Sequence, residues 1–150
     1  MTQTQTRESR PSLVDVLNDL IQLDYDAIAA YEAAIERIDD DAMREQLREF
    51  LQDHRRHTQN LAAIVERSGG EPATEGDAMR YVTKGKVLVG SLLGDHGILL
   101  AMKTNEDETV ARHWEALAIG GLDAAAKSTL EANLADERRH RAWFAAMLEG

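Results

Sequence analysis

Residues Asp136-Glu137-Arg138-Arg139-His140 lie near the end of the chain, and a related stretch, Asp53-His54-Arg55-Arg56-His57, precedes them by 83 positions. When residues 51–61 are laid over residues 134–144, five of the eleven positions are identical. Both stretches lie among strong helix formers such as Ala, Leu, Glu and Arg. The repeat therefore predicts two related helices, and its polar residues are the first candidates for a functional site.

Each stretch carries two potential metal ligands three positions apart. Glu137 and His140 form this pair in the later copy, and His54 and His57 form it in the earlier copy. Residues at this spacing lie one turn apart on the same face of a helix. Inward-facing Glu-x-x-His pairs on two of the helices supply four of the six ligands in dimetal carboxylate sites of helical bundles.

The composition favours one helical domain and excludes several kinds of site. The chain has 150 residues, of which 43% are hydrophobic and only two are proline, so a sizeable helical core is expected. Cysteine is absent, which excludes disulfides, thiolate metal ligands and thiol nucleophiles. The net charge of −10 argues against a nucleic-acid partner and is typical of a solvated acidic surface.

Nothing in the sequence points to a membrane or to export. No apolar run approaches the ~20 residues that a membrane-spanning helix needs. Residues 1–10 are polar and lack the apolar segment of a secretion signal. We therefore expect a cytoplasmic protein without a membrane partner, whose residues 1–11 form a disordered tail.

Apolar residues recur at alternating steps of three and four positions in four segments, which predicts four packed helices. These helices cover about residues 12–38, 41–68, 86–118 and 124–149. Ser12 and Asp15 form a capping box at the first helix, and Gly and Asp residues mark two short turns. Residues 69–85 form a long crossover, in which 77–85 are either loop or a short helix. We predict an all-α, antiparallel four-helix bundle over residues 12–150, with the second and third helices parallel.

Six polar side chains fall on the apolar stripes of these helices. They are Asp24, His54, His57, Glu106, Glu137 and His140. An unpaired buried carboxylate costs several kcal/mol or takes up a proton. One or two divalent ions would offset the carboxylate charge, and neutral imidazoles would complete the coordination. Mixed oxygen and nitrogen ligands suit iron, manganese or zinc.

The repeat extends to the first and third helices. Tyr31 follows Asp24 by seven positions, as His113 follows Glu106, and we expect Tyr31 and His113 to orient the metal ligands. A metal-free interpretation stays open, in which Lys103, one turn from Glu106, and protonated histidines pair with the buried acids. In that case Lys103→Met would be strongly destabilising.

Four short segments occur in a characteristic order: Leu-Asn-Asp-Leu-Ile at 17–21, Ala-Tyr-Glu at 30–32, Gly-Gly-Glu-Pro at 69–72 and Asn-Glu-Asp at 105–107. Together with the polar row, they resemble the ferritin-like superfamily, which includes rubrerythrins and bacterioferritins. The chain is most similar to a bacterial ferritin-like domain family of unassigned function, over about residues 13–149.

The superfamily site has a carboxylate on the first and third helices and a Glu-x-x-His pair on the second and fourth. Carried over by position, the resemblance implies the six ligands named above. His54 stands where a bridging glutamate is expected, and imidazole does not bridge metals as a carboxylate does. Asp24 is also shorter than the usual glutamate. The resemblance therefore implies a mononuclear, asymmetric or zinc-filled site in place of a symmetric di-iron centre.

The function implied by the resemblance is the handling of iron or peroxide under stress by bound Fe(II) or Mn(II), in a homodimer. Rubrerythrins also carry a cysteine-ligated iron domain that feeds electrons. This chain has no cysteine, so a peroxidase cycle would need an external electron donor. The alternative is a non-catalytic bundle with a metal-free polar core, acting in binding or scaffolding. A DNA-protecting bundle is disfavoured by the negative charge.

Overall fold

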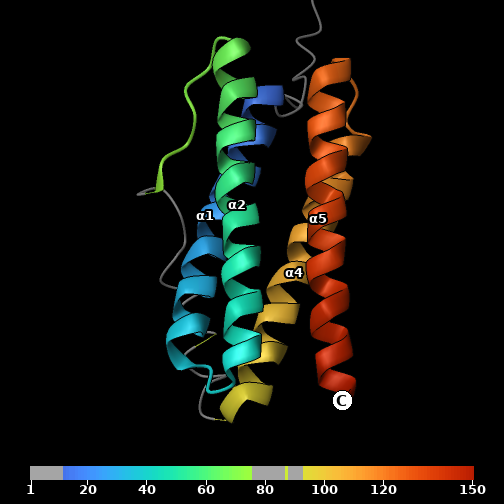
Figure 1. Ribbon diagram of the computed structural model, residues 1–150. Helices are drawn as coiled ribbons and strands as arrows, with labels where there is room; N and C mark the ends of the chain where they lie inside the picture. Colours follow the sequence, from blue (N-terminus) through green and yellow to red (C-terminus); the bar gives the residue numbers. More distant parts are fainter. Residues whose placement is uncertain (1–11, 76–86, 88–92) are drawn as a thin grey trace, which may run out of the picture.

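The computed structural model describes residues 12–75, 87 and 93–150, which form four long α-helices with no β-strand among them (Figure 1). The helices are α1 (Leu13–Arg37), α2 (Asp41–Arg67), α4 (Gly94–Ala118) and α5 (Ala124–Glu149). The prediction of an all-α four-helix bundle is confirmed. The predicted tail and most of the predicted crossover lie outside the described residues.

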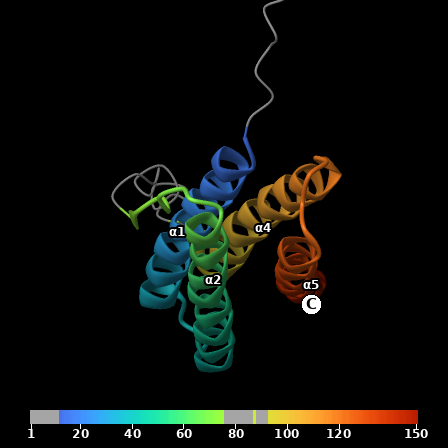
Figure 2. The ribbon, with the colours of Figure 1, turned by 90° about the horizontal axis from the view of Figure 1, so that it is seen from above.

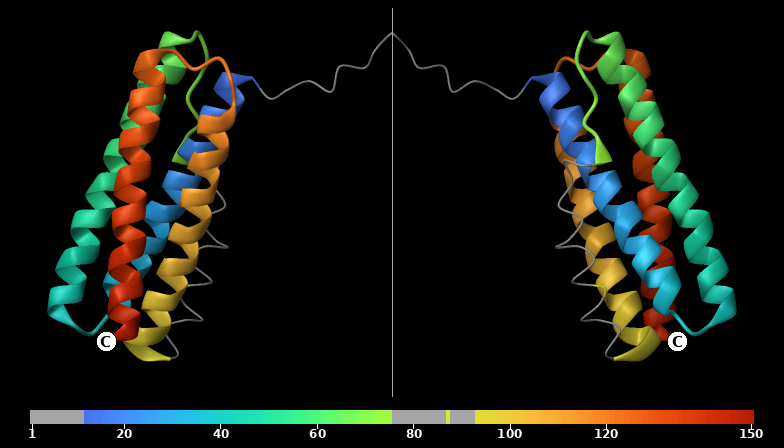
Figure 3. Two further views of the ribbon diagram at one scale, coloured as in Figure 1. Left: turned by 90° about the vertical axis from the view of Figure 1, so that its right-hand side faces the viewer. Right: turned by 90° about the vertical axis from the view of Figure 1, so that its left-hand side faces the viewer.

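The four helices form two hairpins that pack against each other. α1 packs along α2 and α4 along α5, and the hairpins meet through α1 with α4 and α2 with α5. Figure 2 looks down this bundle. The side views in Figure 3 show α2 and α4 running in one direction and α1 and α5 in the other. The second and third predicted helices are therefore parallel, as expected, and all four helices can direct side chains toward a common centre.

Three helix starts follow from the local sequence. The Ser12 hydroxyl accepts a hydrogen bond from the backbone N–H of Asp15 at 3.1 Å, and the Asp15 carboxylate accepts from the Ser12 N–H at 3.3 Å. This is the predicted capping box. Asp40 and Asp123 cap α2 and α5, each accepting from the backbone N–H three positions later, at 2.9 and 2.7 Å.

The third predicted helix has a break at Gly94. Its predicted start near Lys86 lies outside the described residues and Val87 is helical, but α4 begins at Gly94, whose φ is +72°. A residue at this φ is outside the right-handed helical region, so no helix continues through it, and glycine adopts the conformation at little cost. The side chain of Asp95 then accepts hydrogen bonds from the backbone N–H groups of Asp39 and Asp40, at 2.8 and 3.1 Å. These bonds hold the start of α4 to the turn between α1 and α2.

Two apolar clusters fill the bundle, and a layer of buried polar side chains separates them along every helix. The first cluster includes Tyr31, Phe50, Met102 and Phe144. The second includes Leu17, Ile21, Leu61 and Leu130. Packing of apolar side chains explains the two clusters but not the polar layer between them.

Within the described residues, none of the helices has a stretch that is long and apolar enough to span a membrane.

Removal of the cap of α5 should lower stability by a small, measurable amount. We expect Asp123→Ala to lower the free energy of unfolding by about 1 kcal/mol, because the N-terminal backbone donors of α5 lose their acceptor. Asp123→Ser keeps an acceptor and serves as the control. Urea unfolding followed by circular dichroism measures both changes. Equal stability of Asp123→Ala and the parent chain would contradict the assigned cap.

Candidate metal centre

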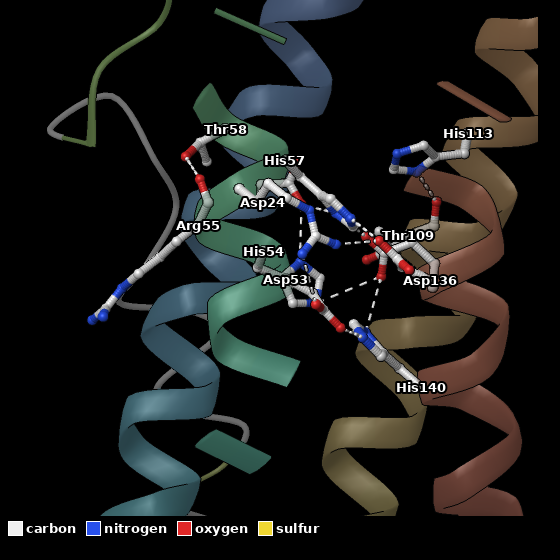
Figure 4. A network of polar contacts seen from close by, with 12 residues as sticks. Asp24, Asp53, His54, Arg55, His57, Thr58, Thr109, His113, Asp136 and His140 are labelled. Atoms are coloured by element: carbon white, nitrogen blue, oxygen red, sulfur yellow. Dashed lines mark hydrogen bonds and ion pairs between the residues drawn. The ribbon is translucent and has the colours of Figure 1, made fainter. Parts of the chain in front are cut away.

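The polar layer at the middle of the bundle receives side chains from all four helices. Asp24 lies on α1, Glu106 on α4, and the other four predicted ligands lie on the repeated stretches of α2 and α5. All six are buried, and Glu106 has the largest exposed fraction, at 1%. Figure 4 shows the rings of His54, His57 and His140 directed toward the same interior region. The structure thus brings all six predicted ligands together.

These residues divide into two groups of four possible ligands that share two members. The first ligand group is Asp24, His54, His57 and Glu137. The second ligand group is His54, Glu106, Glu137 and His140. In each group, one ligand atom of every residue lies within 4.8 Å of the ligand atoms of the other three. The groups adjoin each other because His54 and Glu137 belong to both.

The spacings in the first ligand group fit one metal ion. His54 Nδ1 lies 2.9 Å from Asp24 Oδ1, and His57 Nδ1 lies 3.6 Å from the same oxygen. His57 Nδ1 also lies 3.1 Å from Glu137 Oε1. Nitrogen and oxygen ligands about 2.0–2.1 Å from a tetrahedral ion lie about 3.3 Å from one another. The observed separations scatter around that value.

The second ligand group has similar spacings. His54 Nε2 lies 3.1 Å from Glu106 Oε1 and 3.5 Å from Glu137 Oε2. His140 Nδ1 lies 3.5 Å and 3.7 Å from the same two oxygens. Each group offers two ring nitrogens and two carboxylate oxygens. The two groups therefore offer the same kinds and number of ligand atoms, and the asymmetry in metal occupancy that we expected from the histidine at position 54 stays a prediction.

The outer nitrogens of two histidines are held by carboxylates on the facing helix. His57 Nε2 lies 2.8 Å from Asp136 Oδ2, and His140 Nε2 lies 2.8 Å from Asp53 Oδ2. In turn, Arg56 donates to Asp136 at 2.7 Å and Arg139 donates to Asp53 at 2.8 Å. A carboxylate on the outer ring nitrogen fixes the orientation of a metal-binding histidine and makes it a better ligand. Both Nδ1 atoms are thereby directed to the interior.

Several atoms of this layer are buried without a hydrogen-bond partner among the described residues. They are Asp24 Oδ2, Glu106 Oε2, Glu137 Oε2 and His140 Nδ1. A buried polar atom left without a partner costs free energy. All four atoms belong to the two ligand groups, and all four are donors of electron pairs when the histidine nitrogen is unprotonated. The residues present therefore fit a bound cation.

Without a metal, the histidines must carry the compensating charge. His54 faces Asp24 with one nitrogen and Glu106 with the other, at 2.9 and 3.1 Å, so both contacts are hydrogen bonds only if the ring is an imidazolium. Burial alone would lower the pKa of His54, but Glu137 and Glu106 outweigh it and hold the pKa well above the usual value. Burial similarly opposes the hydrogen bonds that raise the pKa of His57 to about 10 and of His140 to about 9.

The pKa values of two of the buried carboxylates, Asp24 and Glu106, are lowered by their histidine partners. Burial would raise the pKa of Asp24, but hydrogen bonds from His54 and His57 lower it below its usual value. Burial likewise opposes the charge of His54 and the hydrogen bonds around Glu106, which hold the pKa of Glu106 well below its usual range. The metal-free layer is thus a network of carboxylates and imidazoliums at neutral pH.

Of the two residues predicted to orient the ligands, Tyr31 contacts a candidate ligand and His113 contacts a backbone carbonyl. Tyr31 is fully buried and donates a hydrogen bond to the candidate ligand Glu106, while its predicted role in orienting a bound metal's ligands stays a prediction. Burial and the charge of Glu106 raise the pKa of the Tyr31 hydroxyl well above its usual value. His113 is also fully buried, but its Nδ1 lies 2.8 Å from the carbonyl oxygen of Thr109, and its Nε2 has no partner among the described residues.

Lys103 does not lie in the polar layer. Its ammonium group pairs with Asp107 at 3.1 Å, and 32% of its side chain is exposed. The core position beside it is taken by Met102, which is completely buried. The expectation that Lys103 pairs with the buried acids is therefore wrong, because the side chain projects from the outer edge of α4.

The sequence reasoning did not identify Asp53 and Asp136 as part of the site. Each lies beside the apolar stripe of its helix and is only partly buried, with 14% and 23% of the side chain exposed. The signal was present in the repeat, because the two aspartates occupy equivalent positions 83 residues apart. Their role becomes visible only once α2 and α5 are placed side by side.

The metal-free protein should lose stability as the pH rises above neutrality. The folded pKa values of His57 and His140, about 10 and 9, exceed the value of about 6.5 in an unfolded chain. Their stabilising contribution is therefore complete below about pH 6.5 and is lost as the pH rises toward 9–10. Urea unfolding in the presence of a chelator, between pH 6.5 and 9, measures this decline. The slope should be smaller in His57→Gln than in the parent chain, and His96→Gln, which removes an exposed histidine, is the matched control. A pH-independent free energy of unfolding would contradict the network.

Residues 12–118 match the model of the family described as "Domain of unknown function (DUF2383)". The match includes α1, α2 and α4, with four of the six predicted ligands, and ends before α5. No curated protein and no solved structure matches the chain. Because the family model covers more than half of the sequence, the chain belongs to the family with the domain of unknown function DUF2383.

Proposed function

We propose that this chain is a ferritin-like metal-binding protein that handles iron or peroxide at the centre of its bundle. The observation that carries the proposal is the pair of adjoining ligand groups, each with four buried ligand residues from three helices. The helix order supports it, since a long connection between parallel second and third helices is a feature of ferritin-like bundles.

The side chains around the site have separable tasks. Asp24, Glu106 and Glu137 offset the charge of divalent ions, while His57 and His140 are oriented by their outer carboxylates. Tyr31 holds Glu106 in place through its hydroxyl group, and the apolar clusters on either side exclude water from the ligands. A bound iron or manganese ion would supply one-electron chemistry toward oxygen or peroxide.

The ligand atoms restrict the choice of metal only in part. Two nitrogens and two oxygens in each group suit Fe(II), Mn(II) and Zn(II), and we take iron as the working choice, with one or two ions per chain. Since the sequence has no cysteine, the electrons for a peroxidase cycle would come from an external donor.

A second candidate is a metal-free bundle that acts in binding or scaffolding. It is favoured by one observation: His54 forms hydrogen-bond contacts with carboxylates on both sides. Three imidazoliums would then balance the three innermost carboxylates without any cation. Lys103 takes no part in that balance, because its partner is Asp107.

Loss of a shared carboxylate should weaken metal binding. We expect Glu137→Gln to reduce the affinity for Fe(II) by at least tenfold, because Glu137 belongs to both ligand groups. Lys103→Met should bind as the parent chain does and should leave the stability nearly unchanged, since it removes only an exposed pair. Anaerobic equilibrium dialysis with elemental analysis measures the uptake. A parent chain that takes up none of Fe(II), Mn(II) and Zn(II) would contradict the metal site and favour the metal-free candidate.

The iron-loaded protein should consume peroxide. We expect hydrogen peroxide to oxidise Fe(II) in the protein faster than the same concentration of Fe(II) in buffer, as followed by stopped-flow absorbance. Protein loaded with Zn(II), which has no redox chemistry, is the control and should consume none. Oxidation at the rate of free iron, with metal still bound, would contradict peroxide handling and leave a binding function.

A further inference from the structure

His54 lies at the junction of the two ligand groups and has one ring nitrogen in each. Its Nδ1 lies 2.9 Å from Asp24 Oδ1 in the first group, and its Nε2 lies 3.1 Å from Glu106 Oε1 in the second. The ring is completely buried, so neither nitrogen contacts solvent. No other histidine of the described chain is placed in both groups.

Glu137 is the counterpart of His54 in the repeat and spans the same junction. The two positions are 83 residues apart in equivalent stretches. Glu137 Oε1 lies 3.1 Å from His57 Nδ1 in the first group, while Oε2 lies 3.5 Å from His54 Nε2 and 3.7 Å from His140 Nδ1 in the second. Each half of the repeat therefore contributes one side chain with two ligand atoms, directed to different groups.

The outer ligands complete a pair of equivalent sites. Asp24 and His57 lie on one side of the His54 ring, and Glu106 and His140 lie on the other. Each side then has two nitrogens and two oxygens, the number of ligands that a tetrahedral ion takes. If His54 bound a single ion, one of the two sides would keep only three ligands.

We propose that His54 bridges two metal ions, with Nδ1 on the ion held by Asp24 and His57 and Nε2 on the ion held by Glu106 and His140. The proposal rests on the metal-binding function above and specifies how the site holds two ions. A neutral imidazole has one ring nitrogen free to bind a metal and cannot bridge two ions. Binding of both ions displaces both ring protons of His54 to solvent and leaves an imidazolate, which has a free electron pair on each nitrogen. Glu137 forms the second bridge through its two oxygens.

The bridge sets the distance between the ions. A ring that bonds an ion at about 2.0 Å from each nitrogen keeps the two ions about 6 Å apart. That is wider than the separation of about 3.5–4 Å that is usual in two-metal sites. The site would thus hold two four-coordinate ions joined by a ring, and not a close pair joined by small oxygen ligands.

Copper(II) is the probe that tests the bridge. Sites of nitrogen and oxygen ligands generally bind Cu(II) more tightly than Fe(II), and two Cu(II) ions on one imidazolate couple their spins. The full chain is titrated with Cu(II) and followed by electron paramagnetic resonance. The integrated signal should rise to one equivalent and should fall again as the second equivalent binds, because the coupled pair is silent at low temperature.

Two variants assign the coupling to His54. In His54→Gln, which lacks a second ring nitrogen, the chain should bind only one ion or two whose signals add, although Glu137 is retained. His96→Gln removes an exposed histidine and should behave as the parent chain. Circular dichroism establishes that both variants are folded. If His54→Gln is unfolded, the parent titration still tests the proposal, because a single bound ion or two ions with additive signals would overturn the bridge.

The outcomes separate this proposal from the one on which it rests. A single bound ion, two ions with additive signals, or coupling that persists in His54→Gln would each overturn the bridge and leave metal binding intact. A chain that takes up neither Cu(II) nor Fe(II) would overturn the metal site and the bridge together.

Discussion

The carboxylates of Asp24, Glu106 and Glu137 lie in the middle of an apolar bundle, where an ionised group without a partner costs several kcal/mol. The surrounding structure is arranged to meet that cost. Three histidines face the carboxylates, two further aspartates hold two of those histidines, and two arginines at the surface hold the aspartates. The charge therefore alternates from the centre of the bundle to its surface.

The internal repeat explains why this alternation is nearly two-fold symmetric. Each hairpin provides an acid on its first helix and an Asp-x3-His pair on its second, and each aspartate reaches the histidine of the other hairpin. The hairpins are thus held together by their polar layer as well as by their apolar clusters. The symmetry is broken where Tyr31 contacts Glu106 but His113 contacts the carbonyl of Thr109.

Much of the fold and of the candidate site could be predicted from the sequence, because heptad spacing identifies which residues share a buried face. That reasoning placed all six candidate ligands in the core and located three helix starts from their caps. The reasoning placed Lys103 on the buried face of α4, where the structure has Met102. Steps of three and of four positions both fit a heptad pattern, so the sequence did not distinguish these two neighbours. The reasoning also missed the contacts of Asp53 and Asp136, which depend on the distance between helices.

The central claim is that the polar layer is a metal site and not only a charge network. Anomalous diffraction from crystals grown with Fe(II) or Zn(II) tests it most directly. The account predicts two peaks in the polar layer, one on each side of the His54 ring, between Asp24 and His57 and between Glu106 and His140. A map without a peak there, in which His54 still contacts Asp24 and Glu106 as in the metal-free network, would contradict it.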